Sequence, residues 1–185
     1  PRDETELLVD ISKNYYQKKD LKVVDLGTGS GCIAISIALE IPKSIVLGVD
    51  KYLDALNVAT KNKHIHQVTN FHVKQSDWLS DINVYDFDVV ISNPPYIDPT
   101  DKHLKDLIHE PKNALIAADR GLSDIKKISI QAYKKLKIGG ILMFEHGFNQ
   151  ADEVKKIMEL SNFHEIENFK DYQLHPRITI GKKLA

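Results

Sequence analysis

Short apolar runs alternate with helical patterns along most of this chain, and this alternation constrains the fold more than any other feature. Each run has the length and β-branched content of a strand, and the segments between the runs repeat their apolar residues with the period of a helix. Strands that are joined through helices lie parallel, because a crossover connection needs a dozen or more residues. The pattern therefore predicts an α/β fold with a mostly parallel sheet and helices on both faces.

The predicted strands are Lys22–Leu26, Ile45–Asp50, Asn70–Gln75, Phe87–Ser92, Gly140–Glu145, His164–Asp171 and Arg177–Lys182. The predicted helices are Cys32–Glu40, Asp54–Lys63, Ser123–Leu136 and Gln150–Leu160. About five residues separate the last two strands, too few for a crossover, so we expect an antiparallel hairpin at one edge of a seven-stranded sheet. Residues 97–118 show no clear period and are expected to form either a binding loop or a plain surface loop.

The composition narrows the class of protein. With 185 residues and 42% hydrophobic residues, residues 1–185 are expected to form one domain. The net charge of −1 gives no basic field for gripping a nucleic-acid backbone, so direct nucleic-acid binding is not expected. No apolar run reaches the roughly 18 residues of a membrane span. The single cysteine, Cys32, favours a reducing, cytoplasmic location, and the histidines lack the spacing of a metal site, so no metal is expected.

A glycine-rich turn, Gly27-Thr28-Gly29-Ser30-Gly31, follows the first predicted strand and opens the first predicted helix. The backbone N–H groups of such a turn, together with a helix N-terminus, can meet an anionic or polar ligand. The spacing of the glycines, with Cys32 where a dinucleotide fingerprint needs a small residue, argues against pyrophosphate. The alternative is a tight turn between strand and helix that binds nothing.

Acidic residues follow the next two predicted strands. Asp50 ends the second strand, where a carboxylate can accept hydrogen bonds from both ribose hydroxyls of an adenosine group. Asp77 follows the third strand and is placed to accept an exocyclic amine, while Trp78 offers a stacking face for the adenine ring. The alternative for Asp50 is a solvated turn residue, and the alternative for Trp78 is an aromatic residue at the edge of the core.

The tetrapeptide Asn93-Pro94-Pro95-Tyr96 follows the fourth predicted strand, at the carboxyl end where open α/β sheets bind their ligands. The two prolines fix φ and remove two backbone donors, so the carbonyls of Asn93 and Pro94 are free to accept hydrogen bonds. A side-chain carboxamide beside such a carbonyl can hold a planar NH2 group. We expect Asn93, Pro94 and Tyr96 to be catalytic, and all four residues to contact the substrate. The alternative is a rigid loop without chemistry.

In this order along the chain, the glycine turn, Asp50, Asp77-Trp78 and Asn93–Tyr96 resemble a class I S-adenosylmethionine-dependent methyltransferase. Further segments resemble one subfamily, the protein-glutamine N(5)-methyltransferases of the HemK or PrmC type: Pro1-Arg2, Glu4-Thr5-Glu6, Glu110-Pro111, Ala114-Leu115, Asp119, Gly121-Leu122, Glu145-His146-Gly147, Gln150, Asp171-Tyr172 and Arg177. Asp3 stands where members of this subfamily usually have proline, and the segment 101–109 is shorter than in typical members.

This resemblance implies a Rossmann-like fold and S-adenosylmethionine as the cofactor, held by Gly27–Gly31, Asp50, Asp77, Trp78 and Asn93. It implies that the substrate is a glutamine in a protein, namely the Gly-Gly-Gln motif of a peptide chain release factor. Members of the subfamily also carry an N-terminal helical domain, and its absence here makes the chain look like a fragment.

Two other functions share parts of this pattern. A DNA or RNA methyltransferase acting on exocyclic amines can use the same tetrapeptide, but it would need a pocket for a flipped base and a basic groove. A non-catalytic binding module could retain the fold as a scaffold.

Overall fold

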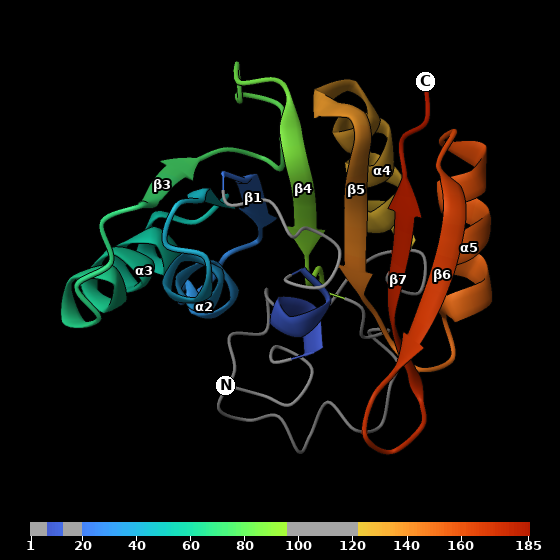
Figure 1. The fold of residues 1–185 in the computed structure, drawn as a ribbon, viewed down its shortest axis with the longest axis horizontal. Coiled ribbons are helices and arrows are strands. Elements are labelled where there is room, and N and C mark those ends of the chain that lie inside the picture. The colour runs from blue at the N-terminus through green and yellow to red at the C-terminus, as the bar shows by residue number, and fades with distance from the viewer. Residues whose placement is uncertain (1–6, 13–19, 96–121) are drawn as a thin grey trace.

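The computed structural model describes residues 7–12, 20–95 and 122–185, and these form a seven-stranded sheet with the order β3-β2-β1-β4-β5-β7-β6 (Figure 1). The strands are β1 (Lys22–Leu26), β2 (Ile45–Asp50), β3 (Phe71–Gln75), β4 (Phe87–Ser92), β5 (Leu136–Glu145), β6 (His164–Lys170) and β7 (Pro176–Lys182). The helices are α2 (Cys32–Glu40), α3 (Leu53–Ile65), α4 (Leu122–Lys135) and α5 (Ala151–Leu160). Residues 7–12 are also helical.

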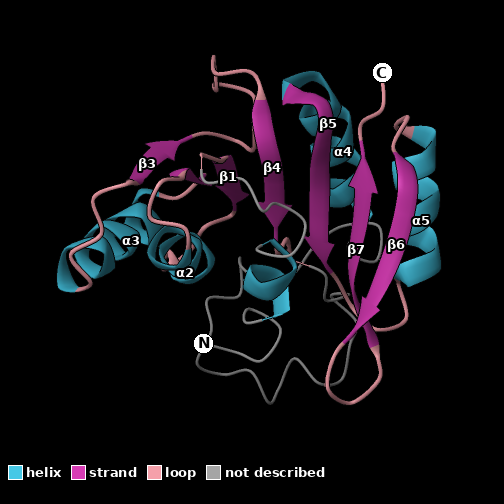
Figure 2. Ribbon diagram, viewed as in Figure 1, coloured by secondary structure: helices cyan, strands magenta, loops and turns pink. Residues whose placement is uncertain are grey.

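Helices cover both faces of the sheet, as the sequence predicts (Figure 2). On one face, apolar residues of segment 7–12, α2 and α3 pack against the sheet, and on the other face α4 and α5 do the same. Strand β4 is buried along its whole length, which is typical of a central parallel strand. In α4, Ile125, Ile128 and Ala132 have no exposed surface, so its apolar stripe faces the sheet.

The predicted boundary between α4 and β5 is wrong. Leu136 is the first residue of β5 and pairs with Phe87 of β4, whereas the apolar period alone extended the helix through it. The strand also continues through Gly139 and starts four positions before the predicted Gly140. Gly139 has a φ of 80° and its N–H donates to the Lys183 carbonyl at 2.6 Å. The strand therefore begins irregularly, and a period-based prediction finds only its regular second half.

The predicted C-terminal hairpin is confirmed, with β6 at the edge of the sheet. The last strand, β7, lies between β5 and β6 and is antiparallel to both, with Glu145 of β5 opposite Ile178. The loop between β6 and β7 consequently lies at the same sheet edge as the carboxyl ends of β4 and β5, at the bottom of Figure 1.

Strand register brings the predicted site residues to this carboxyl edge. Leu26 at the end of β1 pairs with Val49 of β2 on one side and with Ser92 of β4 on the other. Ser92 in turn pairs with Phe144 of β5. The residues that follow these strands therefore lie side by side. Among the helices of the described segments, none combines the length and apolar character needed to cross a membrane.

Candidate functional site

The glycine turn is bound tightly to the end of β2. The backbone N–H groups of Gly27 and Thr28 both donate to the Val49 carbonyl, at 2.8 and 2.9 Å. Gly27, Gly29 and Gly31 all have left-handed backbone conformations, with φ of 72°, 54° and 81°. Non-glycine residues adopt this region only at a cost, so the alternating glycines are required by the turn itself.

Only one of the three glycines has open space beside it. A Cβ atom on Gly29 would meet nothing closer than the Gly27 carbonyl oxygen, at 3.9 Å. A Cβ atom on Gly31 would lie 3.2 Å from the Ala59 Cβ, and one on Gly27 would lie 3.3 Å from the Trp78 ring. Gly31 thus serves core packing, Gly27 serves contact with the indole, and Gly29 is where a ligand could approach the backbone.

Asp25, which the sequence analysis did not select, is buried beneath this turn. Its Oδ2 accepts a hydrogen bond from the Thr28 hydroxyl at 2.7 Å, and the Ala34 N–H in the first turn of α2 also interacts with the carboxylate. No hydrogen bond of normal geometry reaches its Oδ1 from the described residues. Burial raises the pKa of Asp25 to about 6, against the opposing effect of the Thr28 hydrogen bond. A buried polar atom without a partner is rare in folded proteins, so Oδ1 suits a ligand that carries a donor or a positive charge. The signal in the sequence was an aspartate two residues before Gly27.

The raised pKa of Asp25 gives a pH-dependent stability. The folded state prefers the protonated form of Asp25. The stability that the protonated side chain contributes is therefore fully present below the ordinary pKa of 3.8 and is lost as the pH rises through about 6. The ionised form costs about 3 kcal/mol at neutral pH, at roughly 1.4 kcal/mol for each pKa unit. Asp25→Asn is therefore expected to be more stable than the wild type in urea unfolding at pH 7 and equally stable at pH 3.5. An equal difference at both pH values would contradict this.

Asp50 connects the glycine turn to the turn that precedes α3. Its Oδ2 accepts a hydrogen bond from the Gly29 N–H at 3.0 Å, and its Oδ1 accepts one from the Tyr52 N–H at 2.9 Å. The residue is 9% exposed. A carboxylate oxygen has room for a second donor, so both oxygens can still accept hydrogen bonds from a diol. The ribose role remains a prediction, and the geometry is compatible with it.

Asp77 and Trp78 are tied to α4 rather than left open. Asp77 forms an ion pair with Lys127 in which both side chains are close to half exposed, and the Trp78 Nε1 donates to the Asp124 carboxylate at 3.3 Å. The indole lies over Gly27 and also packs against the core that α4 and α5 share. Trp78 thus forms a wall beside the glycine turn, and the predicted acceptor Asp77 is already engaged by a cation.

Asn93 lies one strand away from the glycine turn. The Ser92 hydroxyl donates to the Leu26 carbonyl at 2.8 Å and fixes the end of β4 against the end of β1. Asn93 and Pro95 are half-buried and Pro94 is buried. The structure therefore brings Asn93 and Pro94 to the carboxyl edge beside Gly27. Tyr96, Glu110-Pro111 and the predicted loop 97–118 lie outside the described residues.

The segment after β5 has a structural role. His146 is fully buried, with Nδ1 at 2.9 Å from the Gly147 carbonyl and Nε2 at 2.7 Å from the Thr179 hydroxyl. Burial lowers its pKa and so favours the neutral ring, whose two nitrogens face the Gly147 carbonyl and the Thr179 hydroxyl. Gln150 accepts the Gly147 N–H at 2.8 Å. Glu145-His146-Gly147 thus fixes the turn beside Asn93, and its histidine is not placed to reach a ligand.

The charges around Gly29 select the kind of ligand. Two carboxylates, Asp25 and Asp50, lie within hydrogen-bond reach of the glycine turn, which disfavours a diphosphate and favours hydroxyl groups and positive charge. The N-terminus of α2 has no side-chain cap and no acidic residue in its first turn, and the Ala34 N–H of that turn interacts with the buried Asp25 carboxylate. Within the described ranges, no group of three His, Cys, Asp or Glu residues could hold a metal ion.

Comparison with known proteins identifies relatives of the chain. The chain is 39% identical over 184 residues to the release factor glutamine methyltransferase of Escherichia coli K12, a match covering 98% of the chain and 66% of that protein. It is 42% identical to the protein of the same name from Francisella tularensis, with coverage of 97% and 64%. The chain thus spans just under two thirds of the length of these curated relatives.

Solved structures give the fold. A ribosomal protein L11 methylase from Lactobacillus delbrueckii superimposes with a TM-score of 0.72 at 17% identity, over 99% of this chain and 80% of that one. The predicted Rossmann-like methyltransferase fold is thereby confirmed. The family model described as "Methyltransferase small domain" matches residues 3–171. Since this match includes nearly all of the sheet and every predicted site residue, the chain belongs to the methyltransferase small domain family.

Proposed function

We propose that the chain transfers a methyl group from S-adenosylmethionine to the side-chain amide nitrogen of a glutamine in a peptide chain release factor, at its Gly-Gly-Gln motif. The observation that carries the proposal is the position of Asn93-Pro94-Pro95 at the carboxyl end of β4, one strand from the glycine turn. The relatives are named release factor glutamine methyltransferases, which supports this choice of substrate. This function implies a cytoplasmic location, because release factors act in the cytoplasm.

The residues around the glycine turn fit this cofactor. Bound S-adenosylmethionine supplies an electrophilic methyl group on a positively charged sulfur, beside an amino acid group and an adenosine. Asp50 would accept hydrogen bonds from the ribose hydroxyls, and the unpaired Oδ1 of Asp25 suits the positive end of the ligand. Trp78 would border the adenine, and Gly29 allows close approach of the backbone.

Asn93 and Pro94 would orient the substrate. An amide nitrogen is a poor nucleophile because its lone pair is delocalised into the carbonyl group. If the glutamine NH2 donates one hydrogen to the Asn93 side-chain oxygen and the other to the Pro94 carbonyl, its nitrogen is held in line for methyl transfer. The positive charge that develops on this nitrogen then meets two acceptor dipoles. The proton becomes acidic as the new N–C bond forms and can pass to water, so no strong base is required.

Asp50→Ala tests the cofactor site. The variant is expected to bind S-adenosylmethionine ten- to a hundredfold more weakly, because charge-assisted hydrogen bonds of this kind contribute about 1.5–3 kcal/mol. Isothermal titration measures the change. Asp54→Ala is the matched control, since Asp54 is an exposed carboxylate in the first turn of α3. Unchanged affinity in Asp50→Ala would remove Asp50 from the site.

Mass spectrometry of a release factor tests the function as a whole. The chain is incubated with the release factor and labelled S-adenosylmethionine, and the factor is then digested and sequenced. We expect one added methyl group, on the glutamine of the Gly-Gly-Gln motif. Label that enters DNA or RNA in a parallel reaction, with none in the release factor, would instead identify a nucleic-acid methyltransferase. If the chain does not bind the cofactor at all, the remaining interpretation is a non-catalytic binding module that keeps the fold as a scaffold.

A further inference from the structure

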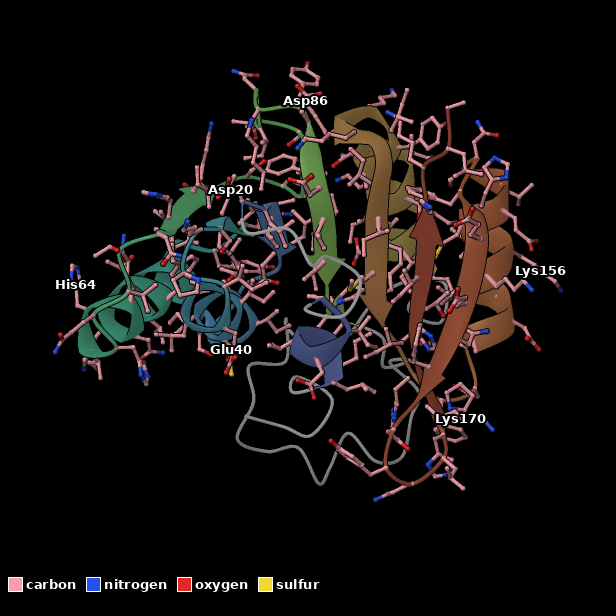
Figure 3. The ribbon with its side chains drawn as sticks, in the orientation of Figure 1. Asp20, Glu40, His64, Asp86, Lys156 and Lys170 are labelled. Carbon is pink, nitrogen blue, oxygen red and sulfur yellow. The ribbon has the colours of Figure 1, made fainter. Side chains whose placement is uncertain are left out.

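The loop between β6 and β7, residues 171–175, lies at the same sheet edge as Asn93. Lys170, labelled in Figure 3, marks where β6 ends and this loop begins. The His146 N–H donates to the Arg177 carbonyl at 2.9 Å, which fixes the base of the loop against the turn that follows β5. The loop is therefore a neighbour of the proposed substrate site, although none of its residues has a role in the proposed chemistry.

The loop is ordered around the Asp171 carboxylate. Asp171 Oδ1 accepts hydrogen bonds from the N–H groups of Gln173 and His175, both at 2.9 Å, and Oδ2 accepts one from Arg177 Nε at 3.1 Å. Two backbone hydrogen bonds of 2.9 Å, from Asp171 to His175 and from Leu174 to Asp171, close the turn. A loop with this many internal hydrogen bonds holds one conformation before any partner arrives.

This ordered loop presents apolar side chains to solvent. Tyr172 is 72% exposed and Leu174 is 73% exposed, and Phe148, in the turn after β5, is 56% exposed. We call these three residues the hairpin patch. Leu174 has a left-handed backbone with a φ of 64°, which is unfavourable for a leucine. Local strain and large exposed apolar side chains on an ordered loop are both features of surfaces that serve binding.

Phe148 also contacts two residues of the hairpin. The Phe148 ring lies 5.5 Å from the His175 ring and 5.9 Å from the Arg177 guanidinium, measured between centres. These contacts hold Phe148 in place, and the charge of the Arg177 guanidinium is balanced by the Asp171 carboxylate at 3.1 Å. A partner segment that presents an apolar side chain therefore fits this surface.

The distance between the patch and Asn93 indicates which partner this is. The strand order β4-β5-β7-β6 puts two to three strand spacings between them, or about 10–15 Å at ~4.8 Å for each spacing. An extended polypeptide covers about 3.3 Å per residue. A protein chain that binds its glutamine at Asn93 and runs along the sheet edge toward β6 therefore reaches the patch about three to five residues from that glutamine.

We propose that the hairpin patch is a docking surface for the substrate protein, which places an apolar side chain about three to five residues from the target glutamine against Tyr172 and Leu174. The proposal rests on the proposed function, because it needs a glutamine at Asn93. It assigns to the Asp171-Tyr172 and Arg177 motif the task of positioning the protein substrate.

Leu174→Asn tests the proposal, because asparagine tolerates the left-handed backbone while removing the apolar side chain. We expect about a tenfold rise in the Kd for a release factor and in KM, with kcat within about twofold and cofactor affinity unchanged. Leu160→Asn is the matched control: Leu160 is 87% exposed and ends α5. A glutamine peptide with only two residues on each side, too short to reach the patch, should be methylated equally by both variants and by the wild type.

The outcomes separate the possible errors. Equal Kd values for Leu174→Asn, Leu160→Asn and the wild type would overturn the docking surface while leaving the methyltransferase function intact. Slower methylation of the short peptide would also overturn it, because the substitution would then act on the site itself. A wild-type chain that binds the release factor through Leu174 but does not methylate it would overturn the proposed reaction and support docking. If sedimentation shows that Leu174→Asn only dissociates a dimer, the patch is a contact between copies and the proposal fails.

Discussion

Asn93→Ala is expected to lower glutamine methylation by about a hundred- to a thousandfold while changing cofactor affinity by less than tenfold. The variant loses the side-chain oxygen that would accept a hydrogen bond from the substrate NH2 group, and loss of one preorganised polar group that stabilises transition-state charge has effects of this size. The Pro94 carbonyl alone cannot fix the direction of the nitrogen lone pair. Single-turnover kinetics with a release factor measure the methyl transfer, and isothermal titration measures cofactor binding.

Asn149→Ala is the control for this experiment. Asn149 is an exposed asparagine in the turn after β5, at the same edge of the sheet, and no role is proposed for it. Its replacement should leave both measurements unchanged. Wild-type turnover in Asn93→Ala would exclude the acceptor role. A parallel loss of cofactor affinity and turnover would mean that Asn93 serves the cofactor pocket instead of the substrate.

The sequence predicts the position of Asn93 well because each local signal agrees with the next. Strand β4 is mostly apolar and is buried throughout, and the two prolines after Asn93 cannot continue a ladder of hydrogen bonds, so its end falls at Ser92 as predicted. The glycine turn is equally predictable, because left-handed φ values at Gly27 and Gly29 require glycine. Local chemistry decides both features.

Contacts between distant segments decide the features that the sequence does not predict. The hydrogen bond between Trp78 and Asp124 joins residues 46 positions apart, and nothing near either residue indicates it. The role of Asp25 depends on its burial and on the unpaired Oδ1 atom, which are tertiary properties. The hairpin motif at Asp171 was identified from the sequence, but its place beside the site follows from the insertion of β7 between β5 and β6.

Gly48 links the packing of the sheet to the site. A glycine is required here for a different reason than in the glycine turn. Its backbone is not left-handed, so the constraint is space alone. A Cβ atom at this position would lie 2.7 Å from Phe71 Cε2 and 2.8 Å from Thr28 Oγ1. Phe71 is fully buried, and Thr28 Oγ1 is the donor to Asp25. Neither neighbour can move without disturbing the core or the base of the glycine turn.

Gly48→Ala is therefore expected to destabilise the fold by about 3 kcal/mol or more, the upper range for overpacking, as measured by urea unfolding. Gly139→Ala is the matched control, because a Cβ atom there meets nothing within 4 Å and only the left-handed backbone is strained, at about 1–2 kcal/mol.

Phe71→Leu provides the internal test of the cause. If the clash with the Phe71 ring is responsible, the double variant Gly48→Ala, Phe71→Leu should be more stable than the sum of the two single effects predicts, since neighbours in contact are not additive. The contact with Thr28 persists in both variants, so we expect Gly48→Ala and the double variant to bind the cofactor equally weakly, although the double variant regains part of the stability. If the two single effects on stability simply add, the Phe71 ring moves aside freely. The spacing of β2 and β3 would then not depend on the absence of a side chain at Gly48.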